Sequence, residues 1–377
     1  MKKYILPTII LILCSAIVPA QELPNFMNRN SFISPEINGS EVTFRIKAPN
    51  AREINLYGSW MPNRTDSESL VEKEDSLWEV TLPLPEPDIY TYHFIIDGIV
   101  MNDAANVLMQ RDGTRYLSML FVEGLKTANY KEASQRGNLT KVWYDSPTLD
   151  MNRRMYVYTP YDYENSEKKY PVLYLLHGGG GDEDAWSNMG RASQILDNLI
   201  EQGKATPMIV VMPNGNPGQQ AAKPLMLNEK PFDNRDPSTA NLFIHSLVKD
   251  IIPYIEKHYR VIAKPDSRAV SGLSMGGGHT INVANLYPGM FGYIAPMSTG
   301  IREGQEIDGQ LQTLKKANYK LYWLACGDAD FAFPRAKLLH EALERNGLPH
   351  TFHITGGGHT WSNWRDYLNT LAPMLFK

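Results

Sequence analysis

Cysteine is scarce in this sequence, because only Cys14 and Cys326 occur among its 377 residues. Cys14 lies in an N-terminal stretch that we expect to be removed, which leaves Cys326 as the one thiol of the mature protein. A single thiol excludes an internal disulfide and a thiolate zinc site, so the hydrophobic core has to stabilise the fold. Histidine, cysteine and glutamate form no cluster with metal-ligand spacing either, and we predict neither a metal nor a cofactor.

An excess of charge is also missing. The formal net charge is −4 and no long basic run occurs, which argues against nucleic acid as a partner. The G-x-x-x-x-G-K-[ST] phosphate-binding pattern is absent, and the glycine run at 178–181 lacks the spacing G-x-G-x-x-G. Hydrophobic residues at 43% and charged residues at 21% are typical of a soluble globular protein that is long enough for two domains.

One apolar run stands apart from the rest of the sequence. Two lysines precede an apolar stretch at 5–18, and small residues follow at 18–20. This pattern is typical of a secretory signal peptide, so we predict that residues 1–20 are cleaved after Ala20. The protein would then be secreted or periplasmic, without a membrane attachment. A retained membrane anchor and a lipid on Cys14 are the alternatives.

Residues 21–124 have an all-β pattern. Short runs alternate apolar and polar residues, and turns of Pro, Asn, Asp and Gly separate them; examples are EVTFRIKAP, EINLYGSW, LWEVTLPL and YTYHFIIDG. Their length and spacing predict a small immunoglobulin-like β-sandwich of about seven or eight strands. A polar linker at 125–138 follows.

From residue 139 to 377, strand and helix patterns alternate. The segments LTKVWYDS and RRMYVYTP predict a β-hairpin, and YPVLYLLHG and PMIVVMPNG are apolar runs expected for parallel strands covered on both faces. Helical spacing predicts helices at 186–202, 241–259, 335–346 and 361–376. We therefore predict a doubly wound α/β domain.

Ser274 stands in a pattern with a chemical meaning. It lies between Gly272 and Gly276 in G-x-S-x-G, directly after an apolar run. This is the strand-to-helix turn of a nucleophile elbow, where the serine hydroxyl projects clear of the sheet. Side chains two positions away on either side would collide with the neighbouring strand and helix, so glycine suits both places. An incidental serine in a glycine-rich loop is the alternative.

A base and an acid should follow Ser274 along the chain. His359 lies in Gly-Gly-Gly-His-Thr-Trp after the last predicted strand, where it could reach the carboxyl edge of the sheet and accept the serine proton. Asp328 and Asp330 both follow the preceding strand, and spacing alone does not choose between them. Packing roles suit the other nearby histidines, His279, His350 and His353.

An oxyanion hole requires two backbone N–H donors. The N–H of Met275, the residue after the nucleophile, is one candidate. The loop Gly178–Gly181 is the source of the other, because glycines let the backbone approach a substrate closely.

The region from about Leu139 to Lys377 resembles carbohydrate esterase family 1, the feruloyl and acetylxylan esterases. The residues that carry the resemblance are YLLHGGGGDEDAW, VVMPNGN, SGLSMGG, CGDADF and GGGHTWSNWR. The resemblance implies an α/β-hydrolase fold for this region.

The same resemblance implies roles for single residues. It makes Ser274 the nucleophile and His359 the base, and its G-x-x-D pattern favours Asp330 as the acid. It also implies Met275 and Gly179 as the oxyanion donors.

The N-terminal region resembles a glycogen-binding-like early-set domain of carbohydrate-binding family 48. The matching stretches are FRIKAPNAREINLYGSW, LWEVTLP and YTYHFIIDG. Trp60, Trp78 and Tyr92 either form a sugar-stacking surface or pack in the core of this domain. Such a domain in an esterase either binds glycan or contacts the catalytic domain.

Three further features belong to the substrate side of the predicted site. We predict that Trp361 and His177 contact substrate, although Trp361 could instead anchor the last helix. A long loop at 217–239 is placed to cover the site and to influence selectivity.

The motifs predict a secreted serine hydrolase, and the resemblance to carbohydrate esterase family 1 implies that it removes feruloyl groups from plant cell-wall xylan. Plant polysaccharide bearing ester-linked acyl groups is then its partner. An acetylxylan esterase and an enterochelin-type siderophore esterase are alternatives with the same machinery. A glycan-binding protein with a relic hydrolase fold is the alternative without catalysis.

Overall fold

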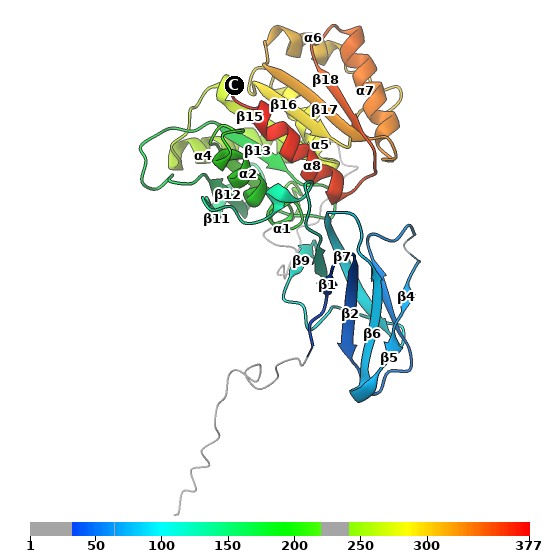
Figure 1. Cartoon of the computed structure of the whole chain (residues 1–377). Coiled ribbons are helices and arrows are strands. Elements are labelled where there is room, and N and C mark those ends of the chain that lie inside the picture. The colour runs from blue at the N-terminus through cyan, green and yellow to red at the C-terminus, as the bar shows by residue number, and fades with distance from the viewer. Residues whose placement is uncertain (1–31, 64, 220–240) are drawn as a thin grey trace, which may run out of the picture.

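The computed structural model describes residues 32–63, 65–219 and 241–377. The predicted signal peptide and most of the predicted loop at 217–239 lie outside these residues. The basic residues of that loop, Lys223, Lys230 and Arg235, lie outside them as well. Figure 1 shows a β-rich N-terminal region, in blue and cyan, below a larger region of helices and strands. Within the described residues, no helix has both the length and the apolar character needed to cross a membrane.

The N-terminal region, called the sandwich from here on, consists of two antiparallel sheets. Its strands are β1 (Glu36–Asn38), β2 (Glu41–Lys47), β3 (Ile54–Gly58), β4 (Glu68–Ser69), β5 (Val71–Glu72), β6 (Leu77–Pro83), β7 (Ile89–Ile96), β8 (Ile99–Met101), β9 (Met109–Asp112) and β10 (Arg115–Phe121). One sheet has the order β1-β2-β6-β5, and the other β4-β3-β7-β10-β9 with β8 paired to β7. The predicted all-β sandwich is confirmed. It has more strands than predicted because two-residue strands such as β4 and β5 carry no alternating pattern.

The aromatic residues considered for sugar stacking lie inside the sandwich. Trp78 is 7% exposed and Tyr92 is 1% exposed, and Trp60 packs against the same core. The Trp60 ring stacks on Phe44 with 5.7 Å between ring centroids. The Tyr92 hydroxyl donates to Asp103 Oδ2 at 2.8 Å. The structure therefore supports a packing role in the core for these three residues rather than a sugar-stacking surface.

The C-terminal region, called the α/β region, contains one sheet of eight strands. They are β11 (Asn138–Ser146), β12 (Met151–Thr159), β13 (Val172–Leu176), β14 (Ile209–Pro213), β15 (Arg268–Leu273), β16 (Tyr293–Met297), β17 (Leu321–Gly327) and β18 (Thr351–Thr355), in the order β11-β12-β14-β13-β15-β16-β17-β18. The first two form the predicted antiparallel hairpin, and the strands from β14 to β18 pair in parallel.

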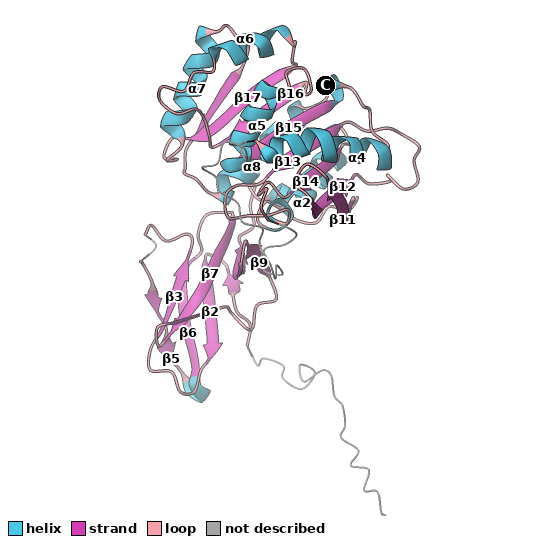
Figure 2. Cartoon of the chain, turned by 180° about the vertical axis from the view of Figure 1, so that it is seen from behind, coloured by secondary structure: helices cyan, strands magenta, loops and turns pink. Residues whose placement is uncertain are grey.

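Helices cover both faces of this sheet (Figure 2). They are α1 (Ala185–Asn188), α2 (Ala192–Glu201), α3 (Leu242–Ser246), α4 (Ile252–His258), α5 (Met275–Leu286), α6 (Asp308–Lys316), α7 (Phe333–Arg345) and α8 (Trp361–Leu371). Helices α2 and α8 pack on one face, and α3 to α7 pack on the other. Along β13, Leu173 and Leu175 face the first layer while Tyr174 faces the second, since successive strand residues point to opposite faces. The predicted doubly wound α/β domain is confirmed.

Two predicted helices are interrupted. The helix predicted at 186–202 breaks at Arg191, whose φ of 52° is left-handed and cannot continue a helix. The helix predicted at 241–259 contains a π-helical segment, Leu247–Ile251, between α3 and α4. Helix α6 is not predicted by apolar spacing because it buries little more than Leu311 and Leu314. Short 3₁₀ segments occur at Glu74–Ser76, Ala128–Tyr130, Pro265–Ser267 and Ala372–Met374.

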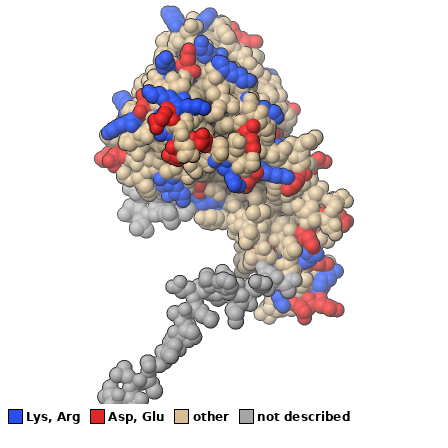
Figure 3. Space-filling view, turned by 60° about the vertical axis from the view of Figure 1, so that its left-hand side comes forward, with Lys and Arg blue, Asp and Glu red and all other residues tan. Residues whose placement is uncertain are grey.

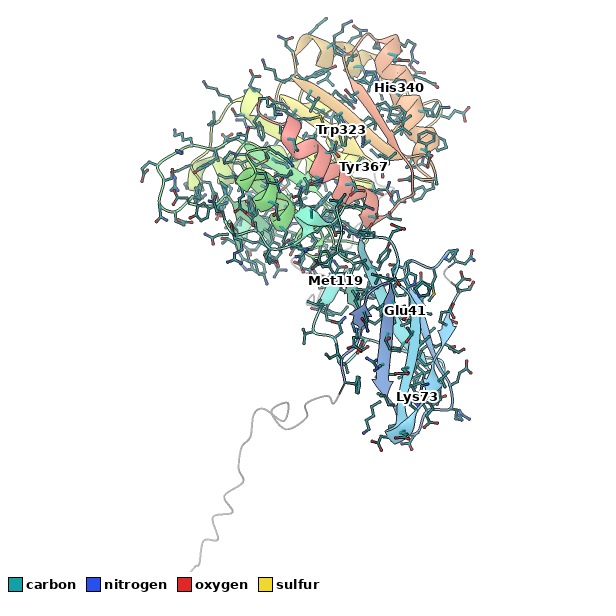
Figure 4. All side chains as sticks on the ribbon, viewed as in Figure 1. Glu41, Lys73, Met119, Trp323, His340 and Tyr367 are labelled. Carbon is teal, nitrogen blue, oxygen red and sulfur yellow. The ribbon has the colours of Figure 1, made fainter. Side chains whose placement is uncertain are left out.

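The predicted linker is a packed connection. Tyr130 is fully buried, and its hydroxyl donates to Asp366 Oδ1 at 2.5 Å. Arg191 donates to the carbonyl oxygen of Tyr130 at 2.9 Å. Ile89 and Met119 of the sandwich belong to the same apolar cluster as α2 and α8, and Figure 4 labels Met119 at this junction. The two regions therefore share apolar core as well as polar bonds.

Candidate active site

Ser274 occupies a strained turn between β15 and α5. Its φ and ψ are 53° and −112°, outside the regions that most residues with a side chain adopt. The Ser274 N–H donates to the carbonyl oxygen of Met297 at 2.9 Å, which fixes the turn against the end of β16. Strain of this kind persists only where surrounding structure imposes it, and it is concentrated at functional sites.

The two glycines of the motif are required by close packing. A Cβ on Gly272 would lie 2.6 Å from the backbone of Gly276, and a Cβ on Gly276 would lie 2.5 Å from the carbonyl oxygen of His177. Both distances are far inside van der Waals contact. Any larger side chain would therefore push β15, α5 and the end of β13 apart.

His359 is held by Asp330. The two carboxylate oxygens of Asp330 lie 2.9 and 3.0 Å from His359 Nδ1, and the backbone N–H of Ala332 donates to Oδ1 at 2.8 Å. The Asp330 side chain is fully buried, whereas Asp328 is exposed. The structure thus brings Asp330 to the histidine and leaves Asp328 on the surface.

The surroundings of Asp330 favour its charged form. Burial raises the pKa of its carboxyl group, but hydrogen bonds from His359, the Ala332 N–H and Ser298 outweigh burial and hold the pKa below its usual value. A charged carboxylate at Nδ1 selects the tautomer with the proton on Nδ1. His359 Nε2 is then free to accept a proton.

A chain of contacts connects His359 to the serine turn. The ring of Trp364 lies 4.9 Å from the His359 ring in an edge-to-face arrangement. Trp364 Nε1 donates to Ser298 Oγ at 2.9 Å, and Ser298 directly follows Met297, whose carbonyl binds the Ser274 N–H. Sequence reasoning missed Trp364, and its only signal is its place on the same helix face as Tyr367 and Leu368.

In the part of the chain that the structure describes, Ser274 Oγ makes no hydrogen bond to the His359 ring. Such bonds are often long before a substrate binds and tighten in its complex.

Backbone donors surround Ser274. The Met275 N–H is the first of α5, so it has no acceptor within the helix and lies at the positive end of the helix dipole. A Cβ on Gly178 would lie 3.4 Å from Ser274 Cβ, which places the glycine loop beside the nucleophile. Gly179 is exposed next to it. The assignment of Gly179 as the second donor stays a prediction.

Comparisons with known proteins show which family and fold this chain resembles. Residues 146–317 match the family model described as "Putative esterase". Over these residues the chain is similar to that esterase family.

Similarity to a curated protein extends beyond residues 146–317. The endo-1,4-beta-xylanase/feruloyl esterase of Xylanibacter ruminicola is 30% identical in an alignment of 371 positions, which covers 94% of this chain and 47% of that protein. The chain thus spans about half the length of this curated relative.

Solved structures give the fold. A CE1 ferulic acid esterase from Anaeromyces mucronatus, in complex with ferulic acid, is 26% identical with a TM-score of 0.54, covering 65% of this chain and 93% of its own. The enterobactin esterase of Shigella flexneri, at 17% identity and a TM-score of 0.62, covers 89% of this chain and 92% of its own. The second likeness shows the fold alone, and it includes the sandwich. The α/β-hydrolase fold of the esterase region is confirmed.

His177 has a supporting position in the α/β region. It is 1% exposed, its Nδ1–H donates to the carbonyl oxygen of Gly178 at 2.7 Å, and its Nε2 accepts from the Gly215 N–H at 2.8 Å. Burial lowers the pKa of His177, which keeps the ring neutral. The predicted substrate contact does not fit this burial, and the ring instead joins two loops at the carboxyl edge of the sheet.

Trp361 packs at the start of α8. Its ring lies edge-to-face against Trp186 at 5.4 Å and against Trp364 at 5.1 Å. The ring is partly exposed and belongs to the apolar layer under α8. These contacts support the anchoring role, and a contact between Trp361 and an acyl group stays a prediction.

The remaining histidines have packing contacts. His279 lies 4.9 Å from the Phe243 ring, and burial lowers its pKa to about 3. The His353 ring stacks on Trp323 at 5.1 Å, and Figure 4 labels Trp323 beside Tyr367 of α8. Over residues 32–63, 65–219 and 241–377, no group of three or more His, Cys, Asp or Glu side chains is arranged to hold a metal ion.

Proposed function

We propose that the protein is a serine carboxylic-ester hydrolase in which Ser274, His359 and Asp330 form the catalytic triad. The observation that carries this proposal is the buried Asp330 carboxylate at 2.9 Å from His359 Nδ1, next to a strained serine turn. The esterase family match supports it.

The geometry supports a two-step reaction. Ser274 Oγ attacks the ester carbonyl as His359 Nε2 takes the hydroxyl proton, and the carbonyl oxygen becomes an oxyanion that faces the Met275 N–H and the glycine loop. His359 then gives the proton to the leaving alcohol oxygen, and the acyl group stays on Ser274. Water that loses its proton to His359 attacks the acyl-enzyme, and the acid leaves as Ser274 regains its proton.

We propose feruloyl groups on plant cell-wall xylan as the substrate. The relative that matches 94% of this chain is named a xylanase and feruloyl esterase, and a structural relative binds ferulic acid. Figure 3 shows one face of the molecule, on which acidic and basic side chains are interspersed, so this face has no patch of a single sign that would attract a highly charged ligand. Export through a signal peptide at residues 1–20 would bring the enzyme to this substrate.

An enterobactin-type ester is the second candidate, because a structural likeness to an enterobactin esterase covers both regions. An anionic iron chelate would require free cations near the serine. The nearby Arg153 is fully buried and donates to the carbonyl oxygens of Asn214 and Asn216 at 2.5 and 3.0 Å. Arg154 pairs with Glu183 at 2.9 Å. Neither Arg153 nor Arg154 is therefore a free cation for such a chelate, which favours the xylan ester.

The test is a comparison of initial rates on methyl ferulate, acetylated xylan and enterobactin, with Ser274→Ala as the control. Ferulate release that the variant abolishes supports the proposal. Release of acetate alone is consistent with the triad but shows that the acyl group is acetyl rather than feruloyl. Cleavage of enterobactin alone shows that the substrate is a siderophore ester rather than a xylan ester. A wild-type protein that binds xylan but cleaves no ester contradicts the enzymatic function.

A further inference from the structure

A hairpin of the sandwich reaches the glycine loop beside Ser274. Strands β9 and β10 form this hairpin. The side chain of Arg111, on β9, extends from the hairpin to the α/β region. The guanidinium donates from Nη1 and Nη2 to the Asp182 carboxylate at 2.9 and 2.5 Å, and from Nε to Asp184 Oδ2 at 2.8 Å. Asp182 and Asp184 follow directly on the loop Gly178–Gly181. Arg111 therefore ties one region to the loop of the other.

The turn of the hairpin touches the loop itself. Gly113 has a φ of +58°, and a Cβ there would lie 2.4 Å from the carbonyl oxygen of Gly180. Both the left-handed backbone and the close approach demand glycine. Arg111 also donates to the carbonyl oxygen of Gly113 at 2.6 Å, so the turn and the loop form one packed unit.

The ion pairs are shielded from water. The side chains of Arg111 and Asp182 are 8% and 1% exposed. Burial lowers the pKa of Arg111, but its bonds to Asp182 and Asp184 outweigh burial and hold the pKa above its usual value. A guanidinium that binds in a fork fixes both distance and orientation, which an ammonium group does not.

Each contact holds a different part of the loop. The esterase region holds Gly178 through His177, Gly181 through Asn216 at 2.9 Å, and Glu183 through Arg154. Among the described residues, the Asp182 carboxylate bonds only to Arg111 and to the Asp184 N–H. The support at Asp182, like the contact at Gly180, therefore comes from the sandwich.

We propose that Arg111 is a positioning residue: it belongs to the sandwich and holds the glycine loop, Gly178–Gly181, in the position needed to stabilise the oxyanion. This inference rests on the proposed function, in which an N–H of the loop stabilises the oxyanion. Oxyanion donors act at about 2.7–3.1 Å, and a misplacement of about 1 Å costs about 10²-fold in rate. Loss of Arg111 releases the loop, so it slows chemistry while the ester still binds.

The first experiment measures kcat and KM of the full-length protein on methyl ferulate for Arg111→Met and Arg111→Lys. The matched control is Arg115→Met in the same hairpin, where the arginine is 72% exposed and 3.7 Å from Asp112. We expect kcat of Arg111→Met to fall about 10- to 100-fold with KM changed less than about 3-fold. Arg111→Lys should recover part of kcat by restoring charge, and Arg115→Met should match the wild type.

A second readout separates positioning from a general loss of stability. A phenylboronic acid forms a tetrahedral adduct with the serine, and its Ki should rise by the same factor as kcat falls. Gly113→Ala, which leaves every charge in place, should have the same effect by pushing on Gly180. Wild-type kcat in Arg111→Met, or a defect confined to KM, overturns the inference.

A third readout does not depend on activity. Amide hydrogen exchange at residues 178–182 should accelerate in Arg111→Met and stay unchanged in Arg115→Met, while exchange in β13 and β15 stays slow. If the wild type cleaves no ester, the proposed function fails and exchange alone decides whether Arg111 orders the loop. Unchanged exchange in Arg111→Met contradicts the inference even if the wild type is an active esterase.

Discussion

Replacing Asp330 by asparagine removes the charge behind His359 while it keeps the shape of the side chain. The wild-type carboxylate accepts the Nδ1–H of His359 at 2.9 Å and is buried. An asparagine can turn its NH₂ group toward Nδ1, which moves the histidine proton to Nε2. That tautomer cannot accept the proton of Ser274.

The magnitude follows from the distance and the burial. Unit charges about 4 Å apart attract by about 4 kcal/mol at an effective dielectric constant of about 20, which equals about three orders of magnitude in rate. The His359 side chain is 20% exposed, so solvent weakens this attraction, whereas the tautomer change adds to the loss. The same replacement in a Ser-His-Asp protease lowers kcat about 10⁴-fold. We expect a fall of about 10³- to 10⁴-fold in kcat for Asp330→Asn, with little change in KM.

The exposed Asp328 provides a matched control two residues away. Steady-state kinetics on methyl ferulate should show Asp328→Asn close to the wild type, and thermal unfolding should show both variants folded. If Asp330→Asn keeps more than about a tenth of the wild-type kcat, the assignment of the acid is wrong. Loss of activity in Asp328→Asn alone would have the same meaning.

Three further predictions concern stability and reactivity. Asp88→Asn removes the carboxylate that lies 2.7 Å from the guanidinium of Arg365, a side chain that is only 1% exposed. The free energy of unfolding, measured in urea, should therefore fall by about 3 kcal/mol. A loss under about 1 kcal/mol would contradict the structure. Burial raises the pKa of Asp88, but its interactions with Arg365, Lys126 and Ser362 together outweigh burial and lower the pKa below 3.8. This stability is therefore present at neutral pH and disappears as pH falls through the folded-state pKa, and stability curves should show a shallower acid limb in Asp88→Asn. Burial raises the pKa of Cys326 to about 12, so iodoacetamide at pH 8 should modify this thiol in urea but not in the native protein, as peptide mapping would show.

Local sequence patterns determined much of this protein. The G-x-S-x-G turn at Ser274 depends on contacts between close neighbours, because a Cβ on Gly272 would lie only 2.6 Å from the backbone of Gly276. The alternating runs of the sandwich and the apolar runs of the sheet depend on strand geometry, which is also local. The predicted fold class and esterase family were confirmed for these reasons.

Other decisions required the tertiary structure. Asp328 and Asp330 lie in one short loop with the same chemistry, and only folding buries one of them beside His359. Trp78 and Tyr92 are residue types that could stack on a sugar ring, but the packing of the two sheets buries both in the core of the sandwich.

The contact between Arg111 and Asp182 illustrates the physical limit. The two residues are 71 positions apart, and although Asp182 stands in the stretch YLLHGGGGDEDAW, nothing in that stretch points to Arg111. Turns and periodicity follow from interactions between neighbours in the chain, whereas an ion pair across two regions exists only after both have folded and docked. Ser274 and His359 could therefore be singled out as candidates from the sequence, while the ion pair of Arg111 with Asp182 was visible only in the folded structure.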